Sequence, residues 1–573
     1  MKKRRLVPAE GWGGGIALSL LLFLLINACS SEPEEPCIAG TPGCADADAD
    51  GDADSDADVD TGPLVFNPPS GTFVESVDVA ISREDGTGGE IRYTLDGSIP
   101  GPSSLLYDGT PIAITQTTEI QAELFENGES LGTAVAVYIP RTADVSINLP
   151  IVVIDNQGGG EPDREYVHSL FMVFETHDEV ASLSNPADTA VRSAFHLRGQ
   201  SSAEFDKKPY RVELRDRNDE DKDYSVLGMP SESDWVLRGP YVDRSLIRDA
   251  FHYGLGPDMG LAAPRFAFCE FYKNLDGDAL EPEDYEGVYM VVETIKNQKY
   301  RQDLKQLEPE DTTLPEISGG YIFKFEWMAA EEPLIECPGI ENCWGDLEAH
   351  DPDDINREQE AWLADYLYSF TTALHSENFT DPTVGYTAYV DTASFVNHII
   401  INELGREFDS YVRSAFFYKD RDDVIFAGPL WDYNLTLGVG MSTMWDNIST
   451  EGWTYDAAFE REPSDDWFLR MLDDPAFVTQ LKERWRTLRT GVLSDAALLA
   501  RIDALAAPLT EGAARNFERW PDLLGTSSGG DVWGGDGISD MFEYTATQTW
   551  AEQIDVLKQW LLARTAWLDS QWN

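Results

Sequence analysis

Short segments with alternating apolar and polar residues fill the chain from Phe66 to Ile139. A period of two places every second side chain on the same face of a strand. Turn residues separate these segments, as expected for consecutive short strands. The pattern predicts a compact antiparallel β-sandwich over residues 63–141. The apolar positions of the four clearest segments are Val77, Val79 and Ile81; Ile91, Tyr93 and Leu95; Ile112 and Ile114; and Ile120, Ala122 and Leu124.

A second pattern runs from residue 147 to residue 573 and predicts a mixed α+β domain. Strand-like segments dominate as far as about Phe325, and helical periodicity dominates from about residue 355 onward. On the last predicted helix the apolar positions are Ile554, Leu557, Leu561 and Leu568, with Trp560 and Trp567 on a flanking stripe. We interpret the two tryptophans as packing residues. The fold class is therefore multidomain, with an all-β sandwich followed by an α+β domain whose C-terminal part is helical.

Residues 1–29 have the pattern of an export signal. Four basic residues at positions 2–5 precede the apolar run Gly15–Ile26, which is too short for a comfortable membrane span but suits a signal peptide. The run ends in Leu25-Ile26-Asn27-Ala28-Cys29, which resembles the bacterial lipobox. That resemblance implies cleavage before Cys29, lipidation of its thiol, and an extracytoplasmic protein on the outer membrane or cell surface. An ordinary secretory signal and an uncut anchor are the alternatives.

Residues 30–62 form an acidic segment, and within it Asp alternates with small residues from position 45 to position 60. Such a segment has too little apolar surface to fold, so we expect an extended linker. Asp46, Asp48, Asp50 and Gly51 resemble the start of a calcium-binding EF-hand loop, but Ala57 stands where the bidentate Glu is needed. The whole chain has 42 basic and 103 acidic residues and a formal charge of −61. This charge argues against nucleic acid as a partner and favours basic protein partners.

The cysteines suggest disulfides in an oxidising compartment. Cys37 and Cys44 are close in sequence, as are Cys337 and Cys343, and each pair could close a small loop. Cys269 lies in an apolar run and is predicted to be a buried thiol. No cysteine has metal-ligand spacing with a histidine, so zinc is not supported.

Charged residues next to predicted strands are the first candidates for ligand binding. Arg198 lies in a turn of small polar residues before the strand Tyr210–Leu214. We expect Lys208 to share the apolar face of that strand and Lys207 to point to solvent. A buried anion, such as a nucleotide phosphate, would then satisfy Lys208, whereas the alternative is a lysine that snorkels to the surface. Glu293 ends another apolar strand and needs a cationic partner, for which Lys208 and Lys324 are the candidates.

Two carboxylates near the aromatic strand Ala415–Tyr418 are the strongest catalytic candidates. Asp409 precedes this strand, and Asp432 follows it in the segment Trp431-Asp432-Tyr433-Asn434. Paired acids of this kind can hold Mg²⁺ and accept a proton from a hydroxyl group. Those are the two tasks that phosphoryl transfer requires of acidic residues.

The N-terminal β segment resembles a known accessory module. Its motifs are Pro69–Phe73, Ile91–Pro100 and Tyr107, and they are similar to the small β-module at the C-terminus of chitobiases and β-hexosaminidases. The resemblance implies a β-sandwich without catalytic residues. Such a module could be a spacer or could bind a glycan.

The larger domain resembles the CotH kinase family of atypical protein kinases. The resemblance runs from about Leu149 to beyond Gly438 and rests on the ordered motifs around Arg198, Lys208 and Glu293 and on the two acidic motifs. It implies a divergent kinase-like fold that uses ATP and Mg²⁺ or Mn²⁺ to phosphorylate Ser or Thr of a protein. Asp409 then matches the catalytic aspartate and Asp432 the metal-binding aspartate. Lys208 matches the phosphate-contacting lysine, with Lys207 and Lys324 as alternatives.

Two residues depart from that family pattern. Ser414 replaces an expected metal-binding Asn, and Asn434 replaces the second Asp of a Trp-Asp-x-Asp motif. Both are neutral and are weaker ligands for Mg²⁺ than the expected groups. The main prediction is an active kinase whose substrate is a basic, Ser-rich surface protein. The alternative is a degenerate scaffold or adhesin whose β-module binds a glycan, and a glycosidase is a third interpretation.

Overall fold

The computed structural model describes residues 63–84, 88–326, 333–407, 409–441, 448–455, 466–526, 528–529 and 542–573. All of these residues belong to one compact unit, Ala57–Asn573. The predictions for the signal peptide, Cys29, the acidic linker, and the pair Cys37 and Cys44 lie outside the described residues. Within those residues, no helix is long and apolar enough to cross a bilayer.

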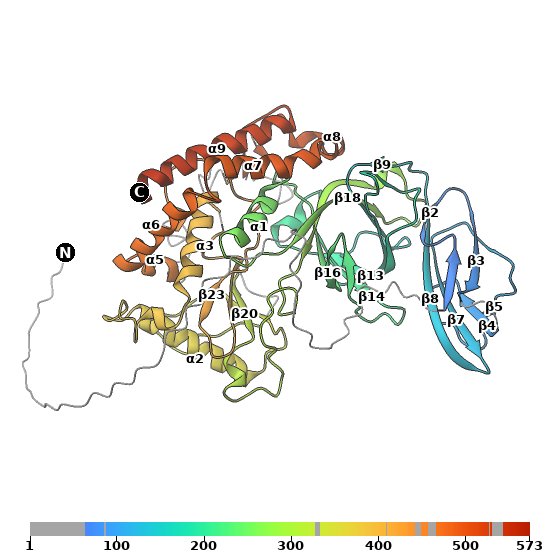
Figure 1. Cartoon of the computed structure of the whole chain (residues 1–573), viewed down its shortest axis with the longest axis horizontal. Helices are drawn as coiled ribbons and strands as arrows, with labels where there is room; N and C mark the ends of the chain where they lie inside the picture. The colour runs from blue at the N-terminus through green and yellow to red at the C-terminus, as the bar shows by residue number, and fades with distance from the viewer. Residues whose placement is uncertain are drawn as a thin grey trace, which may run out of the picture. The chain divides into compact units, whose positions relative to one another are not determined.

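The first part of the described chain is a β-sandwich, as its alternating pattern predicts (Figure 1). One sheet has the order β1-β3-β6 and the other has the order β2-β8-β7-β4-β5. Val79, Ile120 and Leu124 are fully buried between them. The strands are β1 (Leu64–Asn67), β2 (Gly71–Phe73), β3 (Val77–Arg83), β4 (Glu90–Thr94), β5 (Leu105–Leu106), β6 (Ile112–Ile114), β7 (Thr118–Glu126) and β8 (Glu129–Pro140).

A seven-stranded closed barrel follows, with the order β10-β11-β13-β14-β17-β19-β18. Alternation along β17 shows how the barrel is built. Trp235 and Leu237 pack in the interior, whereas Val236 packs on the opposite face in the large core formed with the helices. The strands are β10 (Ile151–Asp155), β11 (Val167–Phe174), β13 (Thr189–Leu197), β14 (Tyr210–Arg215), β17 (Asp234–Arg238), β18 (Phe266–Asn274) and β19 (Tyr285–Glu293).

The rest of the domain combines a second sheet with the helices. The sheet has the order β21-β20-β22-β23, and its Phe323 and Phe417 are buried in the same core as the helices. Its strands are β20 (Tyr321–Phe325), β21 (Leu347–Asp351), β22 (Ala415–Lys419) and β23 (Ile425–Ala427). Short pairs are formed by β9 (Ser146–Ile147) with β12 (Ala181–Ser182) and by β15 (Tyr224–Val226) with β16 (Met229–Glu232), and β24 (Gly440–Met441), β25 (Ser528–Gly529) and β26 (Phe542–Glu543) form a small sheet.

Helix starts follow capping residues in the sequence. Asn356 caps α2, Asp391 caps α3 and Ser494 caps α7, each through a side-chain oxygen that accepts a backbone N–H. Thr549 and Glu552 form a capping box at the start of α9. The helices are α1 (Arg248–Asp258), α2 (Arg357–Leu374), α3 (Thr392–Gly405), α5 (Trp467–Met471), α6 (Pro475–Arg489), α7 (Asp495–Ala506), α8 (Thr510–Arg519) and α9 (Trp550–Trp572).

Helix α9 packs beside α7 and α6 and also contacts α3 (Figure 1). Its predicted apolar positions are buried, including Leu557, Leu561 and Leu568. The fold class predicted from the sequence is therefore confirmed, because a β-sandwich precedes an α+β domain that ends in helices.

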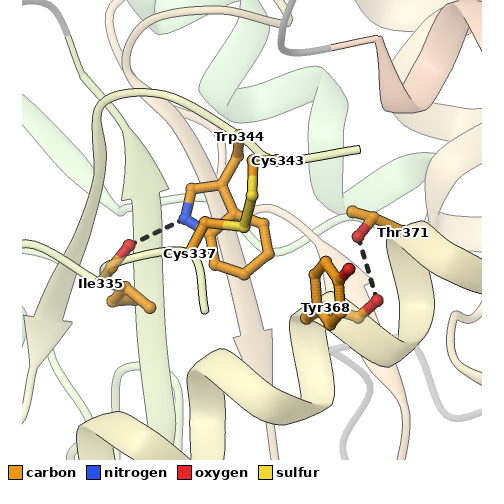
Figure 2. The surroundings of a disulfide bond; sticks show 6 residues. All are labelled: Ile335, Cys337, Cys343, Trp344, Tyr368 and Thr371. Atoms are coloured by element: carbon orange, nitrogen blue, oxygen red, sulfur yellow. Dashed lines mark hydrogen bonds between the residues drawn. A yellow bond between two sulfur atoms is a disulfide. The ribbon is translucent and has the colours of Figure 1, made fainter. Parts of the chain in front are cut away.

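A disulfide closes a small loop beside α2. Cys337 and Cys343 are joined with an S–S distance of 2.03 Å. Figure 2 shows this bond with Trp344, whose indole N–H donates to the Ile335 carbonyl at 2.8 Å. Cys269 is a buried free thiol.

Candidate functional site

The segment Trp431–Asn434 follows β23 and carries the candidate metal-binding aspartate. Asp432 has a φ of 64°, a left-handed conformation that non-glycine residues seldom adopt. Such a backbone persists only where neighbouring groups hold it. The Asp432 N–H donates to the Tyr253 hydroxyl at 3.2 Å, and the Tyr433 N–H donates to Asp249 Oδ1 at 2.7 Å. Helix α1 therefore supplies the groups that fix this turn.

Three further contacts join α1 to this segment and to the residues that follow it. His252 stacks on Tyr433 with ring centroids 4.4 Å apart. Arg248 donates to the carbonyls of Thr436 and Leu437 at 2.8 and 3.2 Å. These contacts come from the same helix, so a shift of α1 would move the turn that holds Asp432.

Arg238 connects this turn to the barrel. Its Nε donates to Asp249 Oδ2 at 2.6 Å, and its Nη2 forms an ion pair with Asp432. Burial alone would lower the pKa of Arg238, but the two carboxylates outweigh it and raise the pKa well above its usual value. Burial raises the pKa of Asp249 to about 6, against the opposing effect of Arg238. We call Arg238, Asp249 and Asp432 the Arg–Asp–Asp triad.

Arg198 and Trp431 lie next to the triad. The guanidinium carbon of Arg198 is 5.3 Å from the centroid of the Trp431 ring, and that of Arg238 is 5.8 Å from the same ring. Burial and the positive charge of Arg238 lower the pKa of Arg198 to about 10, so this side chain remains a cation at neutral pH. Arg198, which the sequence made a candidate for ligand binding, therefore lies close to Asp432, the predicted metal ligand. Two cations and an aromatic face lie beside a carboxylate that is 35% exposed.

Asp409 lies in the loop between α3 and β22. Its carboxylate is 23% exposed and lies 3.4 Å from Arg413 Nη1. The loop is held against α3, because the Tyr411 hydroxyl donates to the buried Glu403 of that helix at 3.1 Å. Glu403 also forms a fully buried ion pair with Arg564 of α9, at 3.0 Å. A network that reaches the C-terminal helix therefore supports the candidate catalytic loop.

Two oxygen-bearing side chains of the Trp431–Asn434 segment, those of Asp432 and Asn434, are partly exposed. Mg²⁺ is commonly held by one or two carboxylates, several waters and substrate phosphates. Asp432 offers a partly exposed carboxylate, and Asn434, two residues along, is also partly exposed. Ser414 has a φ of 47° at the start of β22 and could add only a neutral hydroxyl. No cluster of three His, Cys, Asp or Glu residues suited to a metal occurs among the described residues.

The burial predicted for the two neighbouring lysines is wrong. Lys207 is fully buried, whereas Lys208 is partly exposed, because β14 begins only at Tyr210 and the alternation does not extend back to them. Lys207 Nζ donates to the Val288 carbonyl and to Asn516 Oδ1, both at 2.7 Å. Burial lowers its pKa from 10.5 to about 7. Lys207 therefore joins the barrel to α8, while Lys208 Nζ lies 3.4 Å from the Ala203 carbonyl.

The predicted partner of Glu293 is also wrong. Glu293 pairs with Arg265 at 2.7 Å and with Arg301 at 3.5 Å, and not with Lys208 or Lys324. Lys324 instead lies 3.5 Å from Glu348 Oε2 and 5.6 Å from the Phe416 ring. The alternation of the strands placed Glu293 correctly at the end of β19, but a strand pattern does not identify partners that loops supply.

The sequence interpretation did not identify Arg238 and Asp249 as site residues. One signal was present in the sequence, because Arg238 ends the otherwise apolar run Trp235–Leu237 and a cation buried in this way needs an acidic partner. Asp249 lies in the first turn of α1. The contact with Asp432 could not be found this way, since it joins segments 194 residues apart.

The domain thus joins a barrel to a helical part and places a buried Arg–Asp pair beside a partly exposed aspartate. In protein kinases a strand lysine pairs with a helix glutamate next to a metal-binding aspartate. The model of the CotH kinase protein family matches residues 195–568, and this chain belongs to that family. The chitobiase/beta-hexosaminidase C-terminal domain matches residues 68–136. No curated protein matches the chain.

Proposed function

We propose that this chain is a lipid-anchored, extracytoplasmic kinase that transfers the γ-phosphate of ATP to Ser or Thr of a surface protein. The observation that carries the proposal is the Arg–Asp–Asp triad. Arg238 of β17 pairs with Asp249 of α1 and reaches Asp432. This arrangement corresponds to the strand–helix ion pair that must be in place in an active protein kinase.

The residues of the site have separate tasks in this proposal. Asp409 accepts the proton of the attacking hydroxyl group, a role typically associated with a 10²–10⁴-fold rate contribution. Arg198 and Arg238 bind phosphate oxygens, since a planar guanidinium matches their geometry. The Trp431 face, which both cations approach, closes the side of the phosphate site. Lys208, which is partly exposed, is a further candidate for phosphate contact.

Asp432 and Asn434 would hold the metal ion, with Ser414 as a weaker ligand. A bound Mg²⁺ or Mn²⁺ neutralises charge on the phosphates. Arg238 already pairs with Asp432, so this guanidinium orients the carboxylate. The neutral Asn434 and Ser414 favour a single firmly held ion over two.

The proposed location rests on the sequence of the first 29 residues. Cleavage before Cys29 would leave a lipidated cysteine at the new N-terminus, followed by the acidic linker. The charge of −61 would attract a basic, Ser-rich substrate by electrostatic complementarity. Incorporation of labelled palmitate into the parent chain, and its loss in Cys29→Ser, would support this part of the proposal. Equal labelling of both chains would contradict it.

The kinase assay uses the purified chain with γ-labelled ATP and either Mg²⁺ or Mn²⁺. Autophosphorylation and transfer to a basic Ser-rich protein are measured for the parent, for Asp432→Ala and for Arg357→Gln, whose arginine is exposed at the start of α2, as a control. We expect label in the parent and the control and none in Asp432→Ala. Absence of label in a folded parent with both metals would reject the proposal.

A degenerate scaffold is the second candidate. Ser414 and Asn434 favour it, because both replace groups with stronger affinity for Mg²⁺. In that case the β-sandwich would bind a glycan and the kinase-like domain would bind no ATP. Polysaccharide pull-down by the chain, together with undetectable ATP–Mg²⁺ binding, distinguishes this candidate from the kinase.

A further inference from the structure

A side-chain amine and a side-chain amide meet in the interior, where α8 packs against β19. Lys207 and Asn516 are both fully buried. Lys207 Nζ donates to Asn516 Oδ1 at 2.7 Å and to the Val288 carbonyl at the same distance. The lysine and the asparagine are 309 positions apart in the sequence. Neither residue has a task in the proposed phosphate transfer.

The amine of Lys207 is available as a nucleophile. An ammonium group cannot attack a carbonyl carbon, because its lone pair already holds a proton. Burial lowers the pKa of Lys207 to about 7, against the opposing effect of Glu286. A large fraction of the molecules therefore carries the neutral amine at neutral pH, whereas an exposed lysine is almost entirely protonated there. Desolvation in this way activates a lysine for covalent chemistry.

The amide of Asn516 is held at its oxygen and unpaired at its nitrogen. Its Oδ1 accepts the Val288 N–H at 3.1 Å as well as the lysine donor. An N–H group in this position stabilises the charge that develops on a carbonyl oxygen under attack. Among the described residues nothing accepts a hydrogen bond from Nδ2, although this atom is buried. Leaving a buried donor unpaired is unfavourable, so departure of this nitrogen removes a cost.

The reacting atoms lie within reach of each other. A C=O bond is about 1.2 Å long, so Asn516 Cγ lies within about 4 Å of Lys207 Nζ. Reacting atoms in a near-attack arrangement are about 3–3.5 Å apart. A small rotation of the lysine side chain, from the oxygen to a position over the carbonyl carbon, closes this difference. The backbone of β19 holds the amide in place, since a Cβ at Gly287 would lie only 2.4 Å from Asn516 Oδ1.

We propose that Lys207 and Asn516 form an intramolecular isopeptide bond. Lys207 Nζ attacks Asn516 Cγ, so that a new N–C bond forms and the bond from Cγ to Nδ2 breaks. A proton of the amine moves to Nδ2, which leaves as ammonia. The reaction consumes no oxidant, metal or second substrate, because the amine and the amide are its only reactants.

The bond closes a covalent loop that contains both acidic motifs, those of Asp409 and Asp432. It ties the barrel to α8 permanently, where the hydrogen bond does so reversibly. Its formation does not depend on kinase activity, so it can fail or hold independently of the proposed function. A linked chain has no lysine proton to lose. Any pH dependence of stability that arises from Lys207 therefore belongs to the unlinked chain, and the state of this residue is measured first.

Peptide mass spectrometry of the full chain, after reduction and digestion with trypsin, tests the proposal. Trypsin does not cut at a linked lysine, so we expect residues 199–211 joined to residues 516–519. The joined species should be lighter than the two peptides together by one ammonia molecule. Recovery of the two regions only as separate peptides from a folded parent would overturn the proposal. Conversion of Asn516 to aspartate without a link would overturn it as well.

Variants test the identity of the linked residues. Lys207→Met and Asn516→Ala should each reduce the joined species at least tenfold, with folding checked by thermal unfolding. Lys208→Met is the matched control and should keep the link, because Lys208 Nζ lies beside the Ala203 carbonyl. If the first two variants do not fold, the peptides of the parent alone decide. An undiminished link in folded Asn516→Ala would show that another side chain reacts, and would overturn the assignment.

Discussion

Arg238 Nε donates to Asp249 Oδ2 at 2.6 Å, and both side chains are buried. The pair joins a barrel strand to the helix that supports the Asp432 turn. Its geometry therefore sets the position of the barrel face relative to the candidate metal ligand. An arginine can do this because its planar fork can engage two carboxylates at once, which an ammonium group does less well.

Replacing Arg238 by Met should destabilise the protein strongly. The change leaves Asp249 buried without its cation, and breaking a buried pair in this way costs about 3–5 kcal/mol. The double variant Arg238→Met/Asp249→Asn should be more stable than the sum of the two single changes implies, because no unpaired charge is left. Urea unfolding of the four proteins gives the coupling. Additive effects within about 0.5 kcal/mol would show that the pair is not energetically coupled.

Asp409→Asn should reduce phosphate transfer by about 10²–10⁴-fold, because an amide cannot accept the hydroxyl proton. Stability should change little, since Asp409 is partly exposed at 23%. Initial rates with γ-labelled ATP and a basic Ser-rich substrate measure the effect. Asp473→Asn, at an exposed ion pair with Arg470, is the matched control and should keep the parent rate. An Asp409→Asn protein with parent activity would remove this residue from the mechanism.

Lys207 should make stability depend on pH. The folded state loses the lysine proton near pH 7, whereas the unfolded chain keeps it up to about pH 10.5. The unfolded state therefore holds more protons between these values, and stability rises with pH in this window. Relative to Lys207→Met, the unfolding free energy of the parent should rise by up to about 1.4 kcal/mol per pH unit.

Urea unfolding of the parent and of Lys207→Met at pH 6, 7, 8 and 9 measures this difference. Below pH 7 the difference should flatten, because the lysine is then protonated in both states. Comparison with the variant cancels the other groups that titrate in this range. Parallel stability curves for the two proteins would show that Lys207 keeps its ordinary pKa in the folded state.

Arg564→Met should destabilise the protein far more than Lys558→Met on the same helix. Arg564 and Glu403 are both fully buried, so removing the arginine leaves a buried carboxylate unpaired, at about 3–5 kcal/mol. Lys558 pairs with Asp503, whose side chain is 64% exposed, and such pairs contribute about 0–1 kcal/mol. Thermal and urea unfolding compare the variants. Similar losses in both would contradict a special role for the buried pair.

Local patterns predicted the architecture well. A period of two along β3 and the helical spacing on α9 depend only on near neighbours in sequence, and both are present. The same reasoning failed in the residues just before β14, where it assigned Lys208 rather than Lys207 to the interior. Alternation ends where the strand ends, and the sequence does not mark that point sharply.

The candidate site was harder to predict because distant segments form it. Sequence motifs made Asp432 and Arg198 candidates, and in the structure Arg198 lies against Trp431, the residue next to Asp432. The partner of Asp432 is Arg238, and that of Glu293 is Arg265. Such partners depend on how the barrel packs on the helices, and no short-range pattern in the sequence contains that information.

The ion pair between Glu403 and Arg564 also has a consequence for how the chain matures. Arg564 is synthesised well after Asp409 and Asp432, yet it holds the carboxylate that orders the loop of Asp409. A chain still emerging from the ribosome therefore has both acidic motifs before the helix that supports them. The site is completed only when α9 docks, so the last part of the domain to arrive sets when this region becomes ordered.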